Sequence, residues 1–249
     1  MQPQQKVTII TITYNAQSTI EKALNSVVNQ SYKNIEHIII DGDSKDNTLK
    51  ICEKFSHIAK IISEPDKGIY DAFNKGIKLA SGDIIGFLNA DDIFYCNNSI
   101  QEIVNTFNNN QTDIVYGNLD FINNEGKVTR NWISKPYKKG LMKKAWMPAH
   151  PTFYCKKEVY DRLGGYNDSF KIAGDFELCL RFLEVNQVSS YYLNKKLVKM
   201  LVGGISNSGL KSKWIIYKEE LRALKINNII VNPLSFFLFK LKKINQYIS

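Results

Sequence analysis

The stretch KVTIITITYN, residues 6–15, decides the fold of this chain. It runs through Val, Ile and Thr almost without a break and ends on the polar pair Tyr14-Asn15. A continuous β-branched run predicts a strand that is buried on both faces. The next apolar residues recur at helical spacing: Ile20, Ala23, Leu24, Val27 and Val28. Ser18-Thr19-Ile20-Glu21 before them has the pattern of a capping box, so a helix should follow the strand.

The same alternation continues to about residue 90. Short apolar runs predict strands at 35–40, 59–62 and 84–88, and helical spacing predicts helices near 46–55 and 69–80. Alternating strands and helices predict an α/β fold with a parallel, Rossmann-like central sheet flanked by helices. Ligands of such sheets bind at the carboxyl ends of the strands. The polar segments that follow the strands should therefore meet in one cleft: Tyr14-Asn15, Asp41-Gly42-Asp43, Glu64-Pro65-Asp66-Lys67 and Asn89-Ala90-Asp91-Asp92.

The pattern changes after residue 98. We expect a helix at 98–107 and then two strands, 114–122 and 127–133, joined by a turn at 123–126, which predict a small antiparallel extension. Residues 133–150 are basic and irregular and predict a flexible loop, and helices are expected at 159–163 and 175–184. A C-terminal helical tail follows, with a helix at about 209–226 and the segment NPLSFFLFKLKKINQYIS at 232–249. Two interpretations of this tail stay open: it lies in a membrane interface, or it docks on the domain.

Composition limits the function classes. The formal net charge of +9 favours anionic partners such as nucleic acid, anionic lipid or phosphorylated substrates, although a solvated basic surface explains it equally well. The N-terminus lacks the features of a secretory signal, and the apolar runs fall short of the roughly 20 residues that span a bilayer. We therefore expect a cytoplasmic protein, with peripheral attachment to the inner face of the membrane as an option. The four widely spaced cysteines (Cys52, Cys96, Cys155 and Cys179) are expected to be buried free thiols.

The acidic pair Asp91-Asp92 follows an apolar strand. Two adjacent carboxylates repel each other unless a positive charge lies beside them, and Mg²⁺ or Mn²⁺ held by one or two carboxylates and substrate phosphates is a common arrangement. An ordinary turn or an Asx cap is the alternative. The chain has neither GxGxxG nor GxxxxGK[ST], which argues against a dinucleotide or P-loop site.

Four blocks together resemble the family 2 glycosyltransferases of the GT-A fold: VTIITITYN, IIIDGDSKDNT, SEPDKGIYDAFNKGIKLASGDIIGFLNADD and AGDFELCLR. The resemblance extends from residue 6 to about 206 and is greatest to small bacterial enzymes that build capsule, O-antigen and colanic-acid-type polysaccharides. It implies a catalytic domain at 1–206, with a nucleotide-binding half at 1–97 and an acceptor-binding half at 98–206. Residues 207–249 lie beyond the resemblance and would form a C-terminal helical segment, for which membrane association and docking on the domain both stay open.

The resemblance also implies roles for individual residues. Thr13, Tyr14 and Asn15 would line the pocket of a nucleotide diphosphate sugar, and Asp41 would recognise the base, commonly uracil. Asp66 and Lys67 would approach the ribose and diphosphate. Asp91 would lie near the sugar nucleotide, and Asp91 or Asp92 would bind a divalent cation, Mn²⁺ or Mg²⁺. Asp175 would be the catalytic base that activates a hydroxyl of a saccharide or lipid-linked saccharide acceptor.

The sequence departs from the family pattern at two positions. Asn89 replaces the first Asp of the DxD-type motif, which leaves the cation ligands less defined. Gly42 stands where many relatives have a second Asp, so base recognition would depend on Asp41. The QxxRW block of processive members does not follow Asp175, which favours a single transfer over polymer synthesis.

Several residues also have purely structural interpretations. Asp175 begins a helix that Leu178, Cys179 and Phe182 would anchor, and its position after Gly174 also suits an N-cap. His150 would lie near the acceptor or metal, although a lone His is more often structural. The basic residues Lys138, Lys139, Lys143 and Lys144 would cover a diphosphate or form a solvated surface. Gly203-Gly204-Ile205-Ser206 resembles a family segment and also suits a plain turn.

Inversion by a single displacement is the mechanism we expect, with a cation acting as Lewis acid on the leaving phosphate. Two rival functions remain: a catalytically silent nucleotide-sugar binder and a basic nucleic-acid-binding protein. The basic residues do not gather on one helix face and no RNA-binding aromatic motif is evident, so we expect no nucleic-acid partner.

Overall fold

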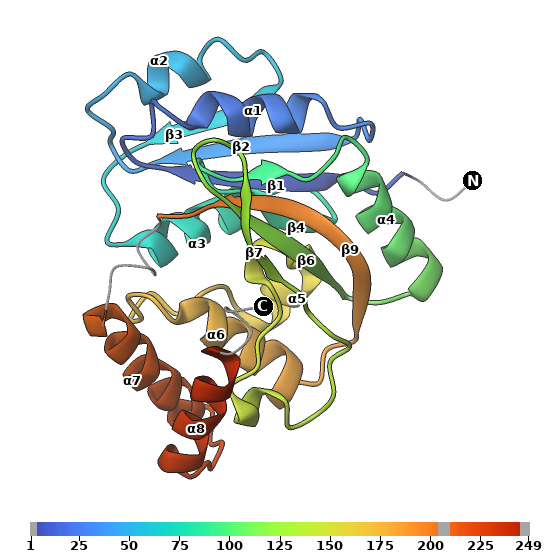
Figure 1. Cartoon of the computed structure of the whole chain (residues 1–249). Coiled ribbons are helices and arrows are strands. Elements are labelled where there is room, and N and C mark those ends of the chain that lie inside the picture. The colour runs from blue at the N-terminus through green and yellow to red at the C-terminus, as the bar shows by residue number, and fades with distance from the viewer. Residues whose placement is uncertain (1–3, 204–209, 245–249) are drawn as a thin grey trace.

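The computed structural model describes residues 4–203 and 210–244. Its first half follows the predicted alternation (Figure 1): β1 (Val7–Thr13), α1 (Ile20–Val28), β2 (Ile35–Asp41), α2 (Thr48–Cys52), β3 (Ile58–Ser63), α3 (Ile69–Leu79) and β4 (Ile84–Phe87). These four strands are parallel, with β1 between β2 and β4. The prediction of a parallel α/β core is confirmed.

The second half extends the same sheet. It contains β5 (Ile93–Phe94), α4 (Ser99–Asn110), β6 (Ile114–Ile122), β7 (Val128–Trp132), β8 (Tyr154–Lys156), α5 (Lys157–Leu163), α6 (Gly174–Cys179) and β9 (Ser190–Leu201). Across the described part of the chain the sheet has nine strands in the order β3-β2-β1-β4-β8-β6-β9-β5, with β7 paired to β6. The predicted extension is therefore continuous with the core sheet. It is antiparallel at β7 and β8, whereas β9 runs parallel to β6.

Strand β9 was not predicted. Its sequence, SYYLNKKLVKML, carries lysines at three of twelve positions, and most of its residues are partly or fully exposed. Lys196 forms an ion pair with buried Asp120 of β6 at 2.8 Å, and Lys195 pairs with Glu102 of α4 at 2.7 Å. The lysines interrupt the alternation of apolar residues that predicts a strand, and acidic partners far away in the sequence neutralise Lys195 and Lys196.

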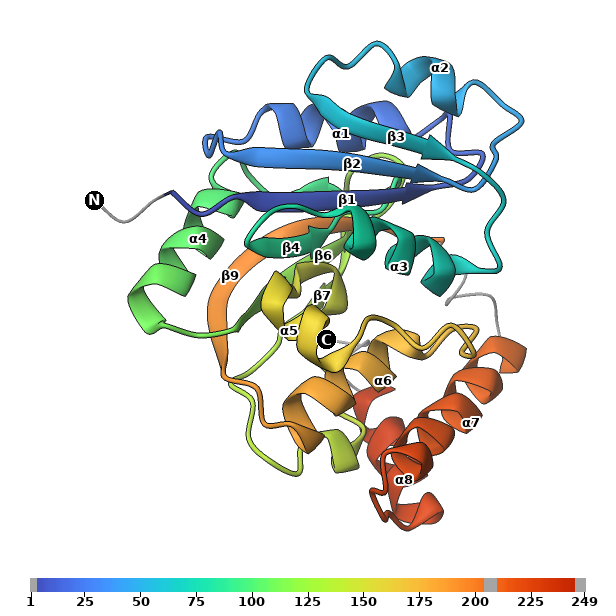
Figure 2. The same ribbon diagram turned by 180° about the vertical axis from the view of Figure 1, so that it is seen from behind.

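Apolar residues on the two faces of the sheet form separate packing layers. Ile9 packs with Val27 of α1 and Ile103 of α4, whereas Ile10 packs with Phe73 of α3 and Val159 of α5. Figure 2 shows α3 and α5 on the face opposite α1 and α4. Because alternate side chains of a strand point to opposite faces, one β-branched run supports both layers.

The predicted capping box is not formed. Helix α1 begins at Ile20 with Thr19 at the N-cap position, and no side chain caps it. The preceding turn is held instead by the loop after β2, because the amides of Ala16 and Gln17 donate to Thr48 and Asp46. This tertiary contact replaces the local one.

Residues 133–150 are irregular, as predicted, apart from the 3₁₀ turn η1 (Met142–Lys144), and they are anchored to the core. Met142 and Trp146 are buried, while Lys138, Lys139, Lys143 and Lys144 are exposed. Glu184, in the π-helical turn η3 (Leu180–Val185) after α6, accepts hydrogen bonds from the Tyr137 hydroxyl (2.7 Å) and the Gly140 amide (2.9 Å). The basic segment is therefore held in place at its apolar residues.

The tail forms α7 (Leu210–Ile226) and α8 (Pro233–Ile244), which pack beside α6 (Figures 1 and 2). Phe236 is completely buried, with its ring 6.2 Å from that of Phe176 in α6. The docked interpretation of the tail is thus confirmed for these helices. No helix in the described residues is both long and apolar enough to span a bilayer.

All four cysteines are free thiols. Cys52, Cys155 and Cys179 are buried as expected, but the prediction was wrong for Cys96, which is exposed in the turn between β5 and α4. Of the segment Gly203–Ser206, residues 204–206 lie outside the described residues.

Candidate active site

The carboxyl ends of β1 and β2 form the first part of the site. The register places Thr13 opposite Asp41, and the Gly42 amide donates to the Thr13 carbonyl at 2.9 Å. Thr13 is buried and its hydroxyl has no hydrogen-bond partner in the described structure. Tyr14, the next residue, is 64% exposed. A strand end therefore presents an exposed aromatic ring beside a buried hydroxyl.

Asp41 is fully buried as the last residue of β2. Its carboxylate accepts hydrogen bonds from the Ser44 amide (2.9 Å), the Ser44 hydroxyl (2.5 Å) and the Ser63 hydroxyl (2.7 Å). Charge-assisted bonds of this kind are stronger than neutral ones. Asp41 thus fixes the loop after β2 and connects it to the end of β3.

Gly42 lies where two predicted site residues approach the backbone. A Cβ atom at this position would lie 2.9 Å from Oδ2 of Asp66 and 3.5 Å from the Tyr14 ring. The departure from the family pattern therefore has a steric role, because a glycine lets Asp66 and Tyr14 converge.

Asn15 adopts a left-handed conformation with φ of 50°. Its amide donates to the Ser44 hydroxyl and its side-chain oxygen accepts from the Lys45 amide, both at 2.8 Å. Asparagine tolerates this conformation better than most residues. Asn15 therefore closes the turn after β1 onto the loop after β2.

Lys75 of α3 organises the loop after β3, and sequence reasoning missed it. Its Nζ lies 2.6 Å from Asp66, 3.0 Å from Glu64 and 3.4 Å from Asp71. Lys67 is exposed, and its backbone amide donates to Asp71 at 3.0 Å. The acids between Glu64 and Asp71 gave only a weak signal that a basic side chain would lie nearby.

The acidic pair lies in a turn after β4. Asp92 is fully buried and Asp91 is partly exposed. The Asn89 side-chain amide donates to Oδ2 of Asp92 at 3.2 Å, and the Asp92 amide donates to the Asn89 carbonyl at 3.0 Å. Burial, and next the charge of Asp91, raise the pKa of Asp92 well above its ordinary value, and burial also raises the pKa of Asp91.

Two oxygens at this turn are suited to a cation. Oδ1 of Asp92 and Oδ1 of Asn89 are buried without a hydrogen-bond partner among the described residues. Buried acceptors are normally satisfied, so these oxygens could accept a partner that the described side chains do not supply. The described residues contain no cluster of three or more His, Cys, Asp or Glu that would form a closed site. The donor set instead fits a hard cation whose remaining ligands come from substrate.

Asp175 is the second residue of α6, whose N-cap is Ala173. The N-cap interpretation is therefore wrong, because the Asp175 side chain makes no cap hydrogen bond. Leu178, Cys179 and Phe182 are buried and anchor this segment as expected. The Asp175 side chain is 17% exposed, and His150 Nε2 lies 3.9 Å from its Oδ2.

Tyr70 connects Asp175 to the helix that follows the loop after β3. It is the second residue of α3, which follows the loop that contains Asp66. Its hydroxyl lies 3.4 Å from Oδ2 of Asp175 and donates to the Ile172 carbonyl at 2.6 Å. Gly174 packs on the Tyr70 ring, since a Cβ there would lie 2.6 Å from it. Burial, and next the charge of Asp175, raise the pKa of the Tyr70 hydroxyl. Sequence reasoning treated this residue only as part of an apolar helix.

His150 belongs to the 3₁₀ turn η2 (His150–Thr152), which packs against β4 and β9. Its ring makes an edge contact with Trp132 of β7, at 5.7 Å between centroids. The structure therefore brings the predicted residues together in three groups: Thr13 to Asn15 with Asp41 and Asp66; Asn89 with Asp91 and Asp92; and His150 with Asp175.

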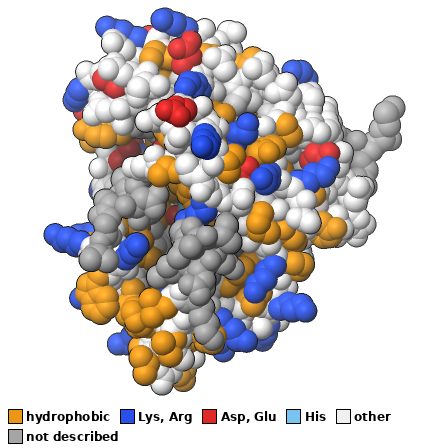
Figure 3. All heavy atoms as spheres, in the orientation of Figure 1, with side chains coloured by type: hydrophobic (Ala, Val, Ile, Leu, Met, Phe, Trp, Pro, Cys, Tyr) orange, Lys and Arg blue, Asp and Glu red, His pale blue; other side chains and the backbone are white. Residues whose placement is uncertain are grey.

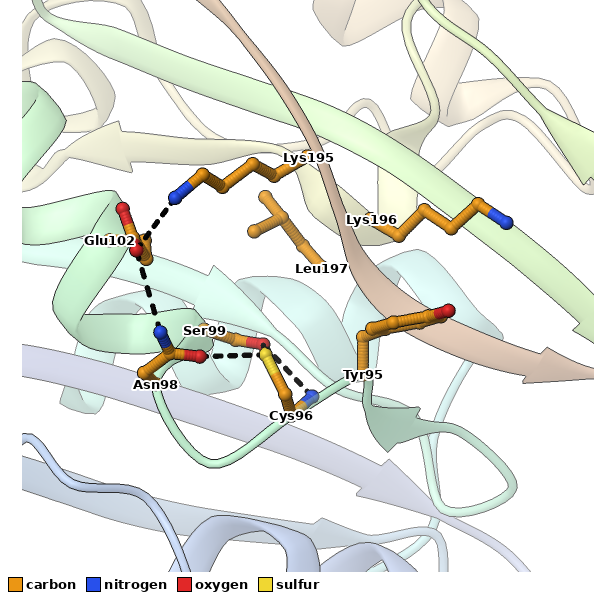
Figure 4. Close-up of a pocket in the computed structure, with 8 residues that line it drawn as sticks. All are labelled: Tyr95, Cys96, Asn98, Ser99, Glu102, Lys195, Lys196 and Leu197. Carbon is orange, nitrogen blue, oxygen red and sulfur yellow. Dashed lines mark hydrogen bonds and ion pairs between the residues drawn. The ribbon is translucent and has the colours of Figure 1, made fainter.

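An open pocket of about 350 Å³ lies between α4 and β9 (Figure 4). None of the predicted site residues lines it. Its charged side chains are already paired, with Lys195 directed at Glu102, and Cys96 donates to Asn98. The pocket therefore lacks unpaired chemistry comparable to that of the strand ends.

The chain matches known sequences over most of its length. The model of the family described as glycosyl transferase family 2 matches residues 8–170. The chain is 31% identical over 242 residues to the Escherichia coli UDP-Glc:alpha-D-GlcNAc-diphosphoundecaprenol beta-1,3-glucosyltransferase WfgD, covering 92% of this chain and 88% of that protein.

Solved structures share the fold. S. aureus TarS 1–349 in complex with UDP-GlcNAc superposes with a TM-score of 0.73 at 20% identity over 98% of this chain and 73% of that chain. The chain spans 44% of a longer TarS chain. The mannosyltransferase PcManGT from Pyrobaculum calidifontis, in complex with GDP-Man and Mn²⁺, superposes with a TM-score of 0.65 at 17% identity, covering 89% of this chain and 65% of that one. The chain thus has the GT-A fold and belongs to glycosyl transferase family 2.

Proposed function

We propose that this glycosyltransferase moves one sugar from a UDP-sugar to a hydroxyl of a saccharide or lipid-linked saccharide acceptor, in a metal-dependent, inverting and non-processive reaction. One structural relationship carries the proposal. The helix that follows the Asp66 loop contributes Tyr70, whose hydroxyl lies 3.4 Å from Asp175. Helix α3 thereby links the loop that contains Asp66, where the nucleotide would bind, to Asp175, whose carboxylate is suited to proton transfer.

The donor would occupy the ends of β1 to β3, in the half formed by residues 1–97. The exposed Tyr14 ring offers a stacking surface for a base beside Asp41, and Asn15 holds the loop around it. Asp66 and the exposed Lys67 would face the ribose and diphosphate. The UDP-GlcNAc in the TarS structure and the UDP-Glc in the name of WfgD favour a uracil nucleotide.

Asp91 and Asp92 would hold Mn²⁺ or Mg²⁺, with the Asn89 amide oxygen as a further neutral ligand. The unpaired buried oxygens of Asp92 and Asn89 support this assignment, as does the Mn²⁺ bound to PcManGT. The bound cation would neutralise charge on the leaving diphosphate as a Lewis acid. The buried Asn89–Asp92 hydrogen bond would keep one carboxylate oxygen oriented before the substrate binds.

Asp175 would accept the proton of the acceptor hydroxyl. The acceptor oxygen then bonds to the anomeric carbon as the bond from that carbon to the phosphate oxygen breaks, and the nucleoside diphosphate leaves with the electron pair. Attack from the face opposite the leaving group inverts the configuration in one step. Tyr70 and His150 border the carboxylate and would orient it and the acceptor.

The half formed by residues 98–206 would bind the acceptor in the synthesis of a bacterial surface polysaccharide. WfgD is named for a GlcNAc-diphospholipid acceptor, and a diphosphate suits the exposed lysines of the segment 133–150. Glu184 holds this segment through Tyr137 and Gly140 next to the helix that carries Asp175. The lysines would thus approach a lipid diphosphate while its sugar reaches the carboxylate.

We further propose that residues 207–249 contact an anionic membrane on the cytoplasmic side. Figure 3 shows apolar side chains gathered over α7 and α8, where Trp214, Leu234 and Leu238 are at least half exposed. Lys218 lies 5.2 Å from the Trp214 ring. Apolar groups edged by lysines suit an interface of anionic lipid. Co-sedimentation should occur with phosphatidylglycerol vesicles and weaken for W214A/L238A; equal binding to phosphatidylcholine vesicles would contradict this contact.

The function is tested by incubating the protein with Mn²⁺, a synthetic GlcNAc-diphospholipid and a panel of UDP-sugars that includes UDP-glucose and UDP-GlcNAc. We expect release of UDP that requires the acceptor, and a product with inverted anomeric configuration by NMR. Tight UDP binding without any transfer across the panel would favour the silent binder instead.

A further inference from the structure

Glu219 of α7 is joined to the segment that leads into the Asp175 helix. Its carboxylate accepts three backbone hydrogen bonds, from the amides of Lys171 (2.8 Å), Ile172 (2.9 Å) and Ala173 (2.9 Å). The residue is only 9% exposed. Almost the whole hydrogen-bonding capacity of this side chain is therefore directed at three consecutive peptide groups.

These peptide groups lie two to four residues before Asp175. Ala173 is the N-cap of α6, and no side chain from its own neighbourhood caps the helix. Amides at a helix start need acceptors, and a carboxylate is the strongest one available. Of the three amides that Glu219 binds, only that of Ala173 belongs to the helix start, and those of Lys171 and Ile172 lie just before it.

The same segment is held at two further points. Arg222, one turn after Glu219, donates to the Ser169 carbonyl at 3.2 Å and lies 4.4 Å from the Phe170 ring. From the α3 side, the Tyr70 hydroxyl donates to the Ile172 carbonyl at 2.6 Å. The segment 169–173 is thus clamped between α3 and α7, and Asp175 follows it by two residues.

We propose that Glu219 is a positioning residue for Asp175, so that α7 helps to set the geometry of the active site. This inference rests on the proposed role of Asp175 as base. Glu219 lies outside the range 8–170 that the family model matches. Because small displacements of a reacting group reduce rates steeply, loss of the three bonds should slow the transfer step more than it weakens donor binding.

Glu219→Gln is the informative variant, because it keeps the size and shape of the side chain. One of its two terminal atoms becomes an NH2 donor, which must then face at least one of the three backbone N–H groups without accepting from it. Glu220→Gln is the matched control: it lies on the same helix and removes the ion pair with Lys240 of α8. With UDP-glucose and the synthetic GlcNAc-diphospholipid, E219Q should lower kcat about 10- to 100-fold with donor KM changed less than about threefold. E220Q should retain wild-type kcat.

The double variant D175N/E219Q separates positioning from an independent effect. Residues that act as a unit are not additive. If Glu219 acts through Asp175, the double variant should be no slower than D175N alone. The positioning role would be overturned if the fold-losses in kcat of the two single variants multiplied in the double variant. Wild-type kcat in a folded E219Q protein would overturn it as well. Near-normal turnover of D175N would instead remove the proposed base and leave the Glu219 contacts to the exchange measurement below.

Hydrogen exchange tests the contact without reference to activity. In the wild-type protein the amides of residues 171–173 should exchange slowly, and E219Q should release this peptide while E220Q does not. Rapid exchange in the wild type would contradict the inference. If E219Q does not fold, Glu219→Asp replaces it: the shorter side chain keeps the charge, and the same drop in kcat with unchanged donor KM is expected.

Discussion

The side-chain amide of Asn89 donates a 3.2 Å hydrogen bond to the buried carboxylate of Asp92. An aspartate at position 89 would place a second acceptor there. The departure from the usual acidic motif therefore has a physical reason in this protein, since an amide satisfies one oxygen of a carboxylate that is completely removed from solvent.

Replacing Asp92 by Asn should stabilise the protein when no divalent cation is bound. Burial, and next the charge of Asp91, raise the pKa of Asp92 in the folded protein above its value in the unfolded chain. Because folding then disfavours the ionised carboxylate, Asp92 reduces the stability once the pH exceeds the pKa of the unfolded chain. At pH 8, D92N should raise the unfolding free energy by roughly 1–2 kcal/mol. Mn²⁺ should raise the melting temperature of the wild type and leave that of D92N unchanged. Equal responses to Mn²⁺ would exclude Asp92 as a ligand.

Replacing Asn89 by Asp should have the opposite effect. It exchanges a donor for a carboxylate beside Asp92, which should cost roughly 1–3 kcal/mol in chelator. Saturating Mn²⁺ should recover most of that loss if the turn binds the cation. Calorimetric melts in EDTA and in Mn²⁺ measure both quantities, and a loss that Mn²⁺ leaves untouched would count against a cation at this turn.

Gly42→Ala should weaken nucleotide binding with little change in stability. The added methyl would lie 2.9 Å from Oδ2 of Asp66 and must displace that side chain, whereas its 3.5 Å distance to the Tyr14 ring is an ordinary contact. We expect the Kd for UDP to rise about tenfold, equivalent to 1.4 kcal/mol, by isothermal titration calorimetry. An unchanged Kd would count against a contact between Asp66 and the nucleotide.

His37 should make stability depend on pH. It is fully buried on β2, with its ring nitrogens 2.9 Å from His57 Nε2 and from the Thr11 hydroxyl. Burial, and next His57, lower its pKa from 6.5 to about 3. Unfolded chains bind this proton below pH 6.5 and the folded protein does not, so stability is lost as the pH falls from 6.5 towards 3.

The slope should approach about 1.4 kcal/mol per pH unit for this one proton. His37→Gln should flatten the wild-type curve between pH 6.5 and 5 by up to that amount. Comparing the two proteins cancels the opposing contribution of Asp92. Parallel curves over this interval would contradict the assignment.

Much of the fold could be predicted because each core strand is recognisable from its own residues. The β-branched runs of β1 and β2 need no distant partner to be recognised. The elements that were not predicted depend on contacts between residues far apart in the sequence. In β9, Lys195 and Lys196 interrupt the apolar pattern of a strand, and their acidic partners lie on α4 and β6. The predicted capping box was replaced by contacts with the loop after β2.

The candidate site divides in the same way. Asp41, Asp66 and Asp91 follow strands, so topology alone places them at one edge of the sheet. Tyr70 and Glu219 could not be found, because their roles depend on contacts made across 102 and 46 to 48 residues of sequence. Nothing in their immediate neighbourhood distinguishes them from ordinary helix residues.

The central claim, that Asp175 is the base of a sugar transfer, is tested most directly by Asp175→Asn. The variant keeps the shape of the side chain, which makes no cap hydrogen bond that folding would require. We expect wild-type melting and UDP binding, with transfer from the UDP-sugar reduced by at least about 100-fold. Near-normal transfer by a folded D175N protein would contradict the claim.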